Sequence, residues 1–525
     1  MDERCELQIE LKRLKDGYEG TVNPKGFRTS PVLGMCLKPR AEGCAGMERR
    51  ECYGILDAYL RNDEPKVCVL YGLRYTGKST MMCQAMLDMG DEELARTAFI
   101  RADSRYDVRD VELDISRLAE MGYRTVFIDE ATKLRDFHLC CSSMFYNEVR
   151  SGMRIVMSGT DSLGFWMAED DELYGEAVMV HTTVIPYREH SWLIGTDDID
   201  DYIELGGTLR KGMLDVERAV LRDEIPFGSE ESSRRYSTLA IARNIQNSLE
   251  RIPTSPLWGA LYDLYRSKEL TNVINRVVED FNHRFLEEAI ERDVSSNDSE
   301  DVDSAEMYGV VMEALGILNR RDATQPVSQN VLSVLRSYLE ALEVLEIGSE
   351  YRHEGGTWVR GERNLMIQPG MRFCQAKVLV EAVLQDPTFG SLSDAVRSEA
   401  VSRILDSVRG RIMGEIVLSE TARALGPGFS VSRLMFDKGE IDMIVRCDAT
   451  DSCIICEVRH SLYRTAHQRR HLVDPVKCGA VERRFGRISD RVVIYRGEDT
   501  VEDGVTYLNV ERYLSSIPDS VLSLF

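Results

Sequence analysis

Short apolar runs alternate with helix-like segments over residues 47–186 of this 525-residue chain. The apolar runs are KVCVLYG, TAFIRAD, TVFIDE, RIVMSGT and AVMVHTTVIP, separated by segments such as STMMCQAMLDM and HLCCSSMFYNEVRSG. A strand buried on both faces reads as a continuous apolar run, and parallel strands need a crossover connection, usually a helix. The pattern therefore predicts an α/β core over residues 47–194, with a parallel sheet and helices on both of its faces.

The pattern changes after this core. Residues 195–292 have helix-like periodicity and few strand signals, which predicts a helical lid subdomain. Residues 293–306 are acidic and nearly free of apolar side chains, as is typical of a linker. Within residues 307–367, two helical segments precede YRHEGGTWVRGERNLMI, where Gly355 and Gly356 separate two strand-like pieces. Helices followed by such a hairpin predict a winged-helix module.

The two ends of the chain differ in how much they show. Residues 368–525 begin helically and continue with the strand candidates SVSRLMFD, EIDMIVRCD, CIICEVRHS and DRVVIYRG, which predicts a separate α/β domain. In residues 1–46, Gly, Pro and Cys interrupt any period. This N-terminal arm therefore stays unassigned.

Composition narrows the class of protein. No apolar run approaches the roughly 18 residues of a membrane helix, and the first residues lack the apolar core of a signal peptide. The thirteen cysteines are scattered through core-like segments, which favours reduced thiols over a disulfide framework. We therefore expect a cytoplasmic protein with no membrane partner. The net charge of −23 argues against attraction of the whole molecule to nucleic acid, but screening lets a local basic face act independently.

The stretch YGLRYTGKST carries the most specific motif. Gly72, Gly77, Lys78 and Ser79 fit G-x-x-x-x-G-K-[ST] between an apolar strand and a helical segment. In such a loop the backbone N–H groups surround phosphate oxygens, and the helix presents its positive dipole end. We expect Lys78 to reach the β and γ phosphates of ATP and Ser79 to bind Mg²⁺. The predicted nucleotide-binding residues are Gly72, Leu73, Arg74, Tyr75, Thr76, Gly77, Lys78, Ser79 and Thr80.

The stretch TVFIDEAT supplies the acid that a nucleotide site needs for its metal. Asp129 ends an apolar strand, so we expect it to share Mg²⁺ with Ser79, while Glu130 orients or deprotonates the attacking water. The next strand, RIVMSGT, ends near Ser158 and Thr160, and Ser158 is the preferred polar sensor of the γ-phosphate. The predicted catalytic residues of ATP hydrolysis are Lys78, Asp129, Glu130 and Ser158.

Several motifs occur in a familiar order: GLRYTGKST, FIDEAT, MSGTDSL, DYIELGG, GEID and EVRHS. The chain beyond Met47 resembles the prokaryotic AAA+-type P-loop ATPases that carry a C-terminal PD-(D/E)XK restriction-endonuclease-like domain. The resemblance implies an ATP- and Mg²⁺-binding core, a helical and winged-helix lid, and a nuclease-like domain.

One position departs from the family pattern. Gly175 and Glu176 stand where relatives often carry an acidic residue followed by arginine. Because such an arginine stabilises charge on the transferring phosphoryl group, we expect slow hydrolysis. Arg150 and Arg188 are alternative sources of this charge, and a surface role for each remains the competing interpretation.

The resemblance also implies a second site in the C-terminal domain, with Asp442 and Glu457 as Mg²⁺ ligands. If GEIDMIV and CEVRHS form a hairpin that turns at Ala449 and Thr450, Asp442 lies opposite Glu457. Strand alternation then places Arg459 on the same face. An ordinary surface hairpin with a Glu–Arg pair is the alternative.

Three further residues complete this candidate site. Glu415 is expected from the preceding helix and Gln468 from the next one. Arg459 stands where active relatives carry lysine. Because a guanidinium stays charged and is a poor proton acceptor, we expect Arg459 to stabilise an anion rather than to act as a base.

Two functions follow from these motifs. In the first, Mg-ATP closes the core on its lid and positions the nuclease-like domain on nucleic acid. In the second, the chain is a nucleotide-dependent switch, and the nuclease-like domain is an inert docking surface. The expected partners are ATP, DNA at a basic edge, and further copies of the chain in an oligomer. The basic edge comprises Arg464, Arg469, Arg470, Lys477, Arg483, Arg484, Arg487, Arg491 and Arg496. Docking of this edge against the acidic ATPase core and linker is the alternative to DNA binding.

Overall fold

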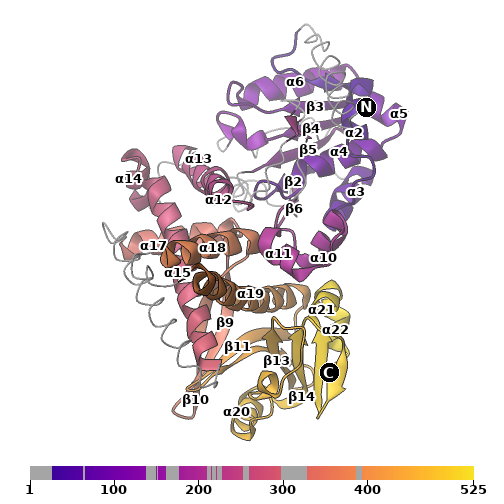
Figure 1. The fold of residues 1–525 in the computed structure, drawn as a ribbon. Helices are drawn as coiled ribbons and strands as arrows, with labels where there is room; N and C mark the ends of the chain where they lie inside the picture. Colours follow the sequence, from indigo (N-terminus) through magenta and orange to yellow (C-terminus); the bar gives the residue numbers. More distant parts are fainter. Residues whose placement is uncertain are drawn as a thin grey trace, which may run out of the picture.

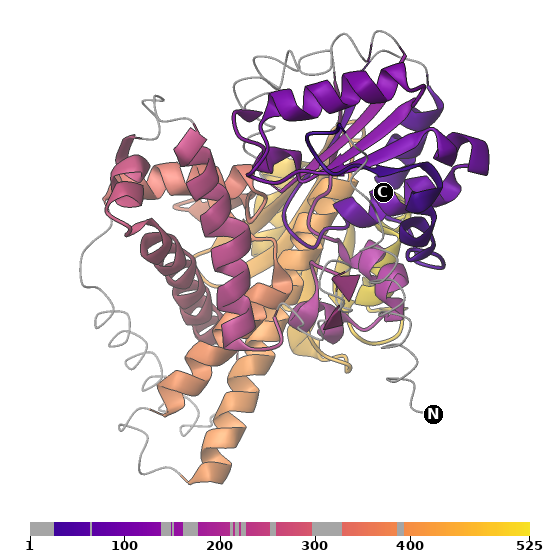
Figure 2. The same cartoon turned by 90° about the horizontal axis from the view of Figure 1, so that it is seen from above.

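A computed structural model describes most of the chain, and Figures 1 and 2 show its arrangement. The described residues are 26–62, 66–137, 149, 152–160, 177–209, 214–215, 220–221, 227–251, 259–296, 328–385 and 393–525. Several predictions fall outside these ranges in whole or in part: the start of the N-terminal arm, most of the 293–306 linker, the beginning of the 307–367 module, and Arg150, Gly175 and Glu176.

A six-stranded sheet forms the N-terminal core, in the order β1-β3-β4-β5-β2-β6. All neighbouring pairs from β3 to β6 are parallel, whereas β1 pairs antiparallel with β3. This arrangement confirms the predicted parallel sheet. The strands are β1 (Val32–Leu33), β2 (Val67–Tyr71), β3 (Thr97–Arg101), β4 (Thr125–Asp129), β5 (Arg154–Gly159) and β6 (Ala177–His181).

Helices cover both faces of this sheet because its strands are apolar on both sides. Along β2, Cys68 and Leu70 pack in the cluster that contains α2, α3 and α4, whereas Val69 packs in the cluster that contains α6. Residues of the unassigned arm belong to the same core, since β1 extends the sheet and Ala41 packs under α4. The helical elements here are η1 (Gly34–Leu37), α2 (Lys38–Glu42), α3 (Tyr53–Arg61), α4 (Lys78–Asp88), α5 (Asp91–Ala95), α6 (Val108–Glu120) and η2 (Ala131–Lys133).

The elements that follow the core are mainly helical, and they are called the lid below. Its apolar cluster joins Tyr236, Ile245 and Leu335 and also takes in Leu73 from the loop after β2. Its elements are α10 (Tyr187–His190), η3 (Ser191–Gly195), α11 (Ile199–Leu205), β7 (Leu214–Asp215), β8 (Val220–Leu221), α12 (Glu230–Tyr236), η4 (Ser237–Ala242), α13 (Arg243–Arg251), α14 (Gly259–Arg266), α15 (Leu270–Ser296) and α17 (Gln329–Ala341).

The C-terminal part contains an eight-stranded mixed sheet in the order β10-β9-β11-β12-β13-β14-β16-β15. The strands are β9 (Leu345–Glu354), β10 (Thr357–Met366), β11 (Phe429–Phe436), β12 (Glu440–Cys447), β13 (Ser452–Arg459), β14 (Arg487–Tyr495), β15 (Thr500–Glu502) and β16 (Val505–Asn509). The helical elements are α18 (Pro369–Leu384), α19 (Asp394–Ala424), η7 (Ala466–Arg469), α20 (Pro475–Phe485), α21 (Val510–Ser515) and α22 (Ile517–Leu522).

The β9–β10 hairpin differs from the predicted separate winged-helix module. It turns at Gly355 and Gly356, both at positive φ, as the sequence predicts. However, β9 also pairs in parallel with β11, and the ring of Trp358 lies 5.3 Å from that of Phe436 and 5.4 Å from that of Phe485. The hairpin is therefore part of the C-terminal sheet. A local pattern of helices and hairpin does not reveal which sheet the hairpin joins.

The lid and the C-terminal sheet share one apolar cluster. It contains Tyr202 of α11, Phe285 of α15, Ile412 and Ile416 of α19, and Val458 of β13. In Figure 1, α10 and α11 lie between the core sheet and the C-terminal sheet. Movement of α11 relative to α19 would therefore be transmitted to the sheet. Within the described ranges, no helix combines the length and apolar character needed to cross a bilayer.

The position of the hairpin predicts how two neighbouring substitutions differ. Trp358→Ala removes aromatic contacts with the C-terminal sheet, whereas Val359→Ala alters a side chain that is 53% exposed. Because Trp358 is only half-buried, we expect Trp358→Ala to lower the free energy of unfolding by about 2 kcal/mol, which is less than the loss for a fully buried tryptophan. Val359→Ala should change it much less. Urea denaturation measures both variants, and equal effects would contradict this placement.

Candidate active site

The loop between β2 and α4 has the backbone shape of a phosphate-binding loop. Gly72 and Gly77 have φ values of 145° and 98°, a region that disfavours residues with a Cβ atom. A Cβ on Gly72 would also lie 2.3 Å from the carbonyl oxygen of Thr182. These two positions therefore require glycine, and Gly77 directly precedes the first residue of α4.

The side chain of Lys78 lies over this loop. Its Nζ donates hydrogen bonds to the carbonyl oxygens of Gly72 and Leu73, at 2.8 and 2.6 Å. Burial lowers the pKa of Lys78 to about 8, against the opposing effects of Glu130 and Asp129. A bound anion at the loop would favour the charged form of Lys78 and raise its pKa, as expected for a phosphate-binding lysine.

Asp129 lies at the centre of the site. Ser79 Oγ donates to its two carboxylate oxygens at 3.0 and 3.1 Å, and Ser158 Oγ donates to Oδ1 at 2.5 Å. These three residues come from α4, β4 and β5, whose ends meet at one edge of the sheet. A hydroxyl beside a buried carboxylate is an oxygen-donor set that suits Mg²⁺, so the residues fit the predicted metal.

Glu130 follows Asp129 and has a different environment. Its φ of 59° turns it out of the strand, and its carboxylate accepts a hydrogen bond from Thr160 Oγ1 at 3.2 Å. Burial would raise the pKa of Glu130, but the charges of Lys133, Lys78 and Arg74 outweigh it and leave the pKa lowered. Glu130 is therefore an ionised carboxylate at neutral pH, able to accept a hydrogen bond from water.

Two hydroxyl residues at the end of β5 contact different acids: Ser158 contacts Asp129, and Thr160 contacts Glu130. Ser158 accepts a hydrogen bond from the Glu130 backbone N–H at 3.2 Å while donating to Asp129. Thr160 contacts Glu130 and, through its carbonyl oxygen, Asn244 of the lid at 2.6 Å. Both hydroxyl residues belong to the site, and each orients one carboxylate.

A buried arginine that no sequence motif marks supports the loop from the side of the N-terminal segment. Arg50 donates to the carbonyl oxygens of Thr76 and Thr183, at 2.7 and 3.1 Å, and forms an ion pair with Glu189 of α10. Its guanidinium thereby joins the P-loop, the end of β6 and α10. Nothing in its neighbourhood, MERRECYG, distinguishes Arg50 from the exposed Arg49.

A second arginine from the N-terminal segment also reaches the site. Arg40 of α2 lies 3.9 Å from Asp129 Oδ2, and its guanidinium carbon lies 3.8 Å from the centre of the Phe99 ring. No motif marks this residue, because its contact with Asp129 depends on how α2 packs against the sheet.

Of the two arginines considered as substitutes for the missing catalytic arginine, the structure describes only Arg188. Arg188 forms an ion pair with Glu51, and its side chain is 34% exposed. This pairing matches the surface interpretation of Arg188. Arg150, Gly175 and Glu176 lie outside the described residues.

The second candidate site has the predicted strand register. Met443 pairs with Cys456 and Cys447 with Ser452, a register that continues to Asp442 opposite Glu457. Arg459 NH1 donates to Asp442 Oδ2 at 2.8 Å, and Arg459 NH2 contacts the Glu457 carboxylate. The structure thus brings these three side chains together.

Two other residues predicted for this site have different roles. Glu415 forms ion pairs with Arg363 and Arg372, because α19 packs on the face of the sheet that carries Met443 and Cys456. Asp442 and Glu457 alternate with those residues and point to the opposite face. Glu415 therefore does not belong to the cluster of Asp442, Glu457 and Arg459, called the Asp442 cluster below.

Gln468 also differs from its predicted role. It lies on the short helix η7, where its side chain accepts from the Thr465 N–H at 3.1 Å and donates to the Tyr463 carbonyl oxygen at 2.8 Å. These contacts fix the local turn. Gln468 thus lies on the next helical element after β13, as expected, but this element is a short 3-10 helix and the next α-helix, α20, begins only at Pro475.

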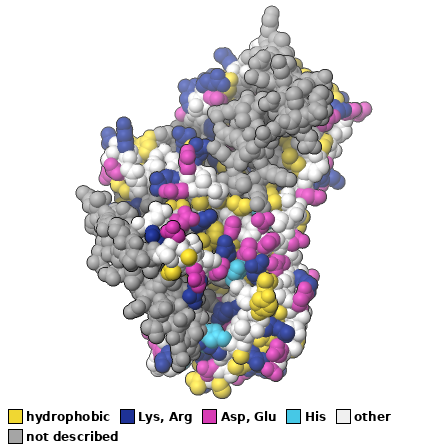
Figure 3. Space-filling view, viewed as in Figure 1, with side chains coloured by type: hydrophobic (Ala, Val, Ile, Leu, Met, Phe, Trp, Pro, Cys, Tyr) yellow, Lys and Arg dark blue, Asp and Glu magenta, His cyan; other side chains and the backbone are white. Residues whose placement is uncertain are grey.

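The predicted basic edge is interspersed with acids. Arg464 pairs with Glu502, Arg469 with Asp503, and Arg496 with Asp200 of α11. On the face shown in Figure 3, dark blue and magenta side chains are both present and intermixed over the C-terminal part. These pairings account for part of the basic run within the chain itself.

Comparisons with known proteins agree with the N-terminal geometry. Residues 64–190 match the family model described as AAA domain. The P-loop, the acidic strand end and strands β2 to β6 lie within the matched residues, so this segment is similar to an AAA domain. The match ends at residue 190 with α10 and does not reach the rest of the lid or the C-terminal sheet.

Two solved structures show weaker similarity. One, described as the structural basis for katanin self-assembly, is 12% identical over 63% of this chain and 96% of that chain, with a TM-score of 0.18. The other, an Hsp104–ADP complex from S. cerevisiae, is 14% identical over 79% of this chain and 61% of that chain, with a TM-score of 0.22. TM-scores this low do not define a shared overall fold. No curated protein matches the chain.

The position of Arg50 predicts an effect on nucleotide affinity. Arg50→Met removes charged hydrogen bonds that hold the Thr76 carbonyl, so we expect ATP to bind at least about tenfold more weakly. Combining it with Glu189→Gln avoids leaving a buried carboxylate unpaired. Titration calorimetry compares these variants with Arg49→Met, which alters an exposed arginine paired with Asp88. Equal affinities in all variants would contradict the proposed support.

Proposed function

We propose that the chain is a Mg-ATP-dependent ATPase whose nucleotide state controls its C-terminal α/β part. The observation that carries this proposal is the hydrogen-bonded set of Ser79, Asp129 and Ser158 beside a glycine-dependent loop. Ser79 supplies the hydroxyl, Asp129 the carboxylate and Ser158 the polar group at a strand end, which are the groups that ATP hydrolysis uses beside a P-loop.

Each residue of the set has a role in hydrolysis. Lys78 binds phosphate oxygens in place of the loop carbonyls that its ammonium now contacts. Ser79 and Asp129 would hold Mg²⁺, which would supply positive charge to the phosphates when bound. Glu130 orients and deprotonates the attacking water, since it remains ionised. Ser158 holds Asp129 and the Glu130 backbone in fixed positions relative to each other, because it donates to the first and accepts from the second.

The lid is placed to sense the P-loop. Leu73 packs in the apolar cluster of the lid, and the ring of Tyr75 lies 6.1 Å from that of Tyr236. Asn244 donates to the carbonyl oxygen of Thr160, next to the contact with Glu130. A change of loop conformation on nucleotide binding would therefore alter the packing of α12 and α13.

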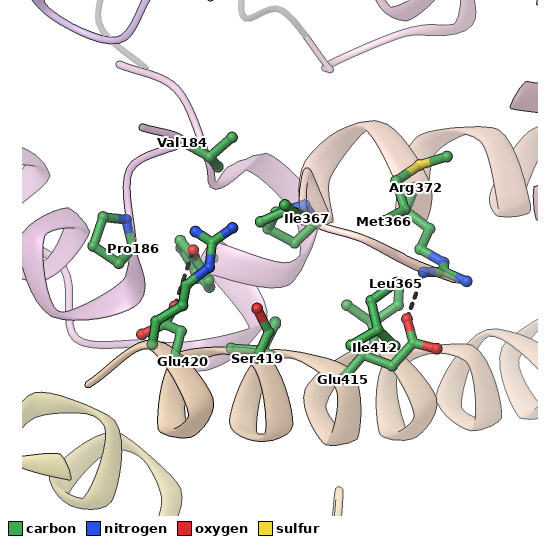
Figure 4. A pocket seen from close by; sticks show the side chains of 14 residues that line it. Val184, Pro186, Leu365, Met366, Ile367, Arg372, Ile412, Glu415, Ser419 and Glu420 are labelled. Atoms are coloured by element: carbon green, nitrogen blue, oxygen red, sulfur yellow. Dashed lines mark hydrogen bonds and ion pairs between the residues drawn. The ribbon is translucent and has the colours of Figure 1, made fainter. Parts of the chain in front are cut away.

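The core is also connected to the C-terminal part through α10 and α11. Glu420 of α19 accepts a hydrogen bond from the Tyr187 N–H at 2.7 Å and one from the Tyr202 hydroxyl at 3.2 Å. Figure 4 shows Glu420 and Ser419 on the side of α19 that faces Val184 and Pro186. Because Arg50 binds Glu189 on the same helix as Tyr187, α10 links the P-loop to α19.

A second connection joins α11 to the ends of two C-terminal strands. Asp200 lies 2.6 Å from His460 Nε2 and 2.6 Å from Arg496 NH1, and Arg409 of α19 pairs with Glu204 at 2.8 Å. His460 directly follows Arg459. The nucleotide state can thereby reach the Asp442 cluster through α11.

The role of the C-terminal part has two candidates. An active nuclease-like domain would act on nucleic acid with its own Mg²⁺. An inert domain would serve as a binding surface whose exposure follows the ATP cycle. The ion pairs of Arg459 with Asp442 and Glu457 favour the second candidate, because they occupy the carboxylates that cleavage would need. A cytoplasmic location and an oligomer remain predictions from the sequence.

Two substitutions test the ATPase itself. Lys78→Ala removes the charge that binds the phosphates, so we expect ATP binding to be lost. Glu130→Gln keeps the shape of the side chain but cannot accept a proton, so we expect ATP to bind while hydrolysis falls at least about 100-fold. Titration calorimetry and phosphate release measure the two steps. A Lys78→Ala protein that binds ATP as tightly as the wild type would refute the proposal.

The buried contacts of Glu420 with Tyr187 and Tyr202 predict that the stability of the protein depends on pH. Burial raises its pKa from 4.5 to about 7, although the hydrogen bonds of Tyr187 and Tyr202 and the charges of Arg423 and Arg188 oppose the shift. A carboxyl with a raised pKa binds a proton on folding between the two values, so stability falls as the pH rises through that window.

We therefore compare wild type with Glu420→Gln, which cannot titrate. Relative to this variant, the wild type is expected to lose about 1.4 kcal/mol of unfolding free energy per pH unit as the pH approaches 7 from below. Urea denaturation between pH 5.5 and 8 measures the difference, and Glu399→Gln, an exposed position on the same helix, serves as the control. Parallel pH profiles for all three proteins would show that Glu420 is not protonated at the junction.

A further inference from the structure

Three oxygen atoms of the second candidate site converge on one guanidinium. Arg459 NH1 donates to Asp442 Oδ2 at 2.8 Å and to the carbonyl oxygen of Val458 at 2.9 Å, and Arg459 NH2 donates to Glu457. The Asp442 and Glu457 side chains are only 5% and 0% exposed. The Asp442 carboxylate also accepts the Val458 N–H at 2.8 Å, which fixes its position on the strand pair.

Two buried carboxylates this close together need positive charge between them. Without it, each would be destabilised both by the loss of water and by the repulsion of the other. Two carboxylates and a backbone carbonyl form the kind of hard-oxygen set that usually binds a divalent cation. Here the chain's own guanidinium contacts all three groups, and its planar fork suits contact with two acids at once.

Other positive groups lie on the same side of the sheet. His471 lies 2.6 Å from Lys477 Nζ through Nδ1 and accepts from Arg470 through Nε2 at 3.0 Å. Burial, followed by the charges of Lys477, Arg470 and Arg459, lowers the pKa of His471 to about 4. A divalent cation that approached Asp442 and Glu457 would therefore meet Arg459, and it would also be repelled by Lys477, whose charge interacts with Glu457.

We propose that Arg459 is an internal cation that takes the place of a divalent metal between Asp442, Glu457 and the Val458 carbonyl. The C-terminal part is then a metal-independent module, and its carboxylate pair maintains structure instead of activating water. The inference deepens the proposed function by deciding between its two candidates for this domain. It depends on the ATPase proposal only for the control of this module by nucleotide.

The test uses the full chain without nucleotide, with Mn²⁺ as the probe and electron paramagnetic resonance as the readout. We expect wild type and Asp442→Asn to bind Mn²⁺ equally, because the cluster holds no metal in either. Arg459→Ala removes the internal cation, so it should gain a Mn²⁺ site at least about tenfold tighter than any in the wild type. Adding Asp442→Asn to Arg459→Ala should abolish that gain.

Thermal unfolding gives a second readout of the same variants. In EDTA, Arg459→Ala should unfold at a lower temperature than the wild type, and Mn²⁺ should restore part of the loss only in the variant. If Arg459→Ala fails to fold in EDTA, recovery of folded protein by purification with Mn²⁺ supports the proposal. Failure to fold in both conditions counts against it, because a metal should then replace the guanidinium.

A cleavage assay addresses the proposal through activity. Plasmid and linear DNA are incubated with ATP and either Mg²⁺ or Mn²⁺, and we expect no cleavage by the wild type. Cleavage that is lost in both Asp442→Ala and Glu457→Ala would overturn the proposal, as would an Asp442-dependent Mn²⁺ site in the wild type. Mg-ATP binding by the same preparations separates this outcome from failure of the ATPase proposal, since it depends on Lys78 and not on Arg459.

Discussion

The organisation of the core depends on the Asp129 carboxylate and the two hydroxyls that hold it. Ser79 contacts it from the first turn of α4 and Ser158 from the end of β5, so the P-loop helix and two strands of the sheet are tied to one acid. A buried carboxylate is stable only when its oxygens are bound, and here one of the partners, Ser79, is also the residue proposed to share a metal with it. The arrangement supports folding and chemistry with the same contacts. Arg50 and Arg40 add two arginines from the segment before β2, one behind the loop and one beside Asp129.

The same core is connected to the rest of the chain by a small number of polar contacts in apolar surroundings. Arg50 joins Thr76 to Glu189 on α10, and the following contact, from the Tyr187 N–H to Glu420, reaches α19. Helix α19 packs on the face of the C-terminal sheet opposite Asp442 and Glu457. Packed elements move as units, so a displacement of α10 can change how the sheet sits against the lid. Coupling of this kind is a physical connection between two sites, and the substitutions at Arg50 and Glu420 act on separate links of it.

Much of the candidate nucleotide site could be predicted because its signals are local. The glycine spacing, Lys78 and Ser79 lie within eight residues, and Asp129 ends an apolar strand that alternation of strands and helices places in the same sheet. The hairpin that puts Asp442 opposite Glu457 is local in the same way. What could not be predicted depends on packing between distant segments. Arg50 and Arg40 reach the site through the docking of residues 26–62, the β9–β10 hairpin joins β11 rather than a separate module, and Glu415 lies across the sheet from the acids it was grouped with.

The central claim is that Asp129 and Ser79 share a metal with a nucleotide held by the P-loop. The most direct measurement is the paramagnetic resonance spectrum of Mn²⁺ bound together with ATP to the purified chain, with coupling to phosphorus as the signature of metal–phosphate contact. The account predicts such coupling in the wild type and a metal affinity at least about tenfold weaker in Asp129→Asn, with nucleotide binding itself retained. A wild-type protein that binds no metal–nucleotide complex, or an Asp129→Asn protein with unchanged metal affinity, would contradict it.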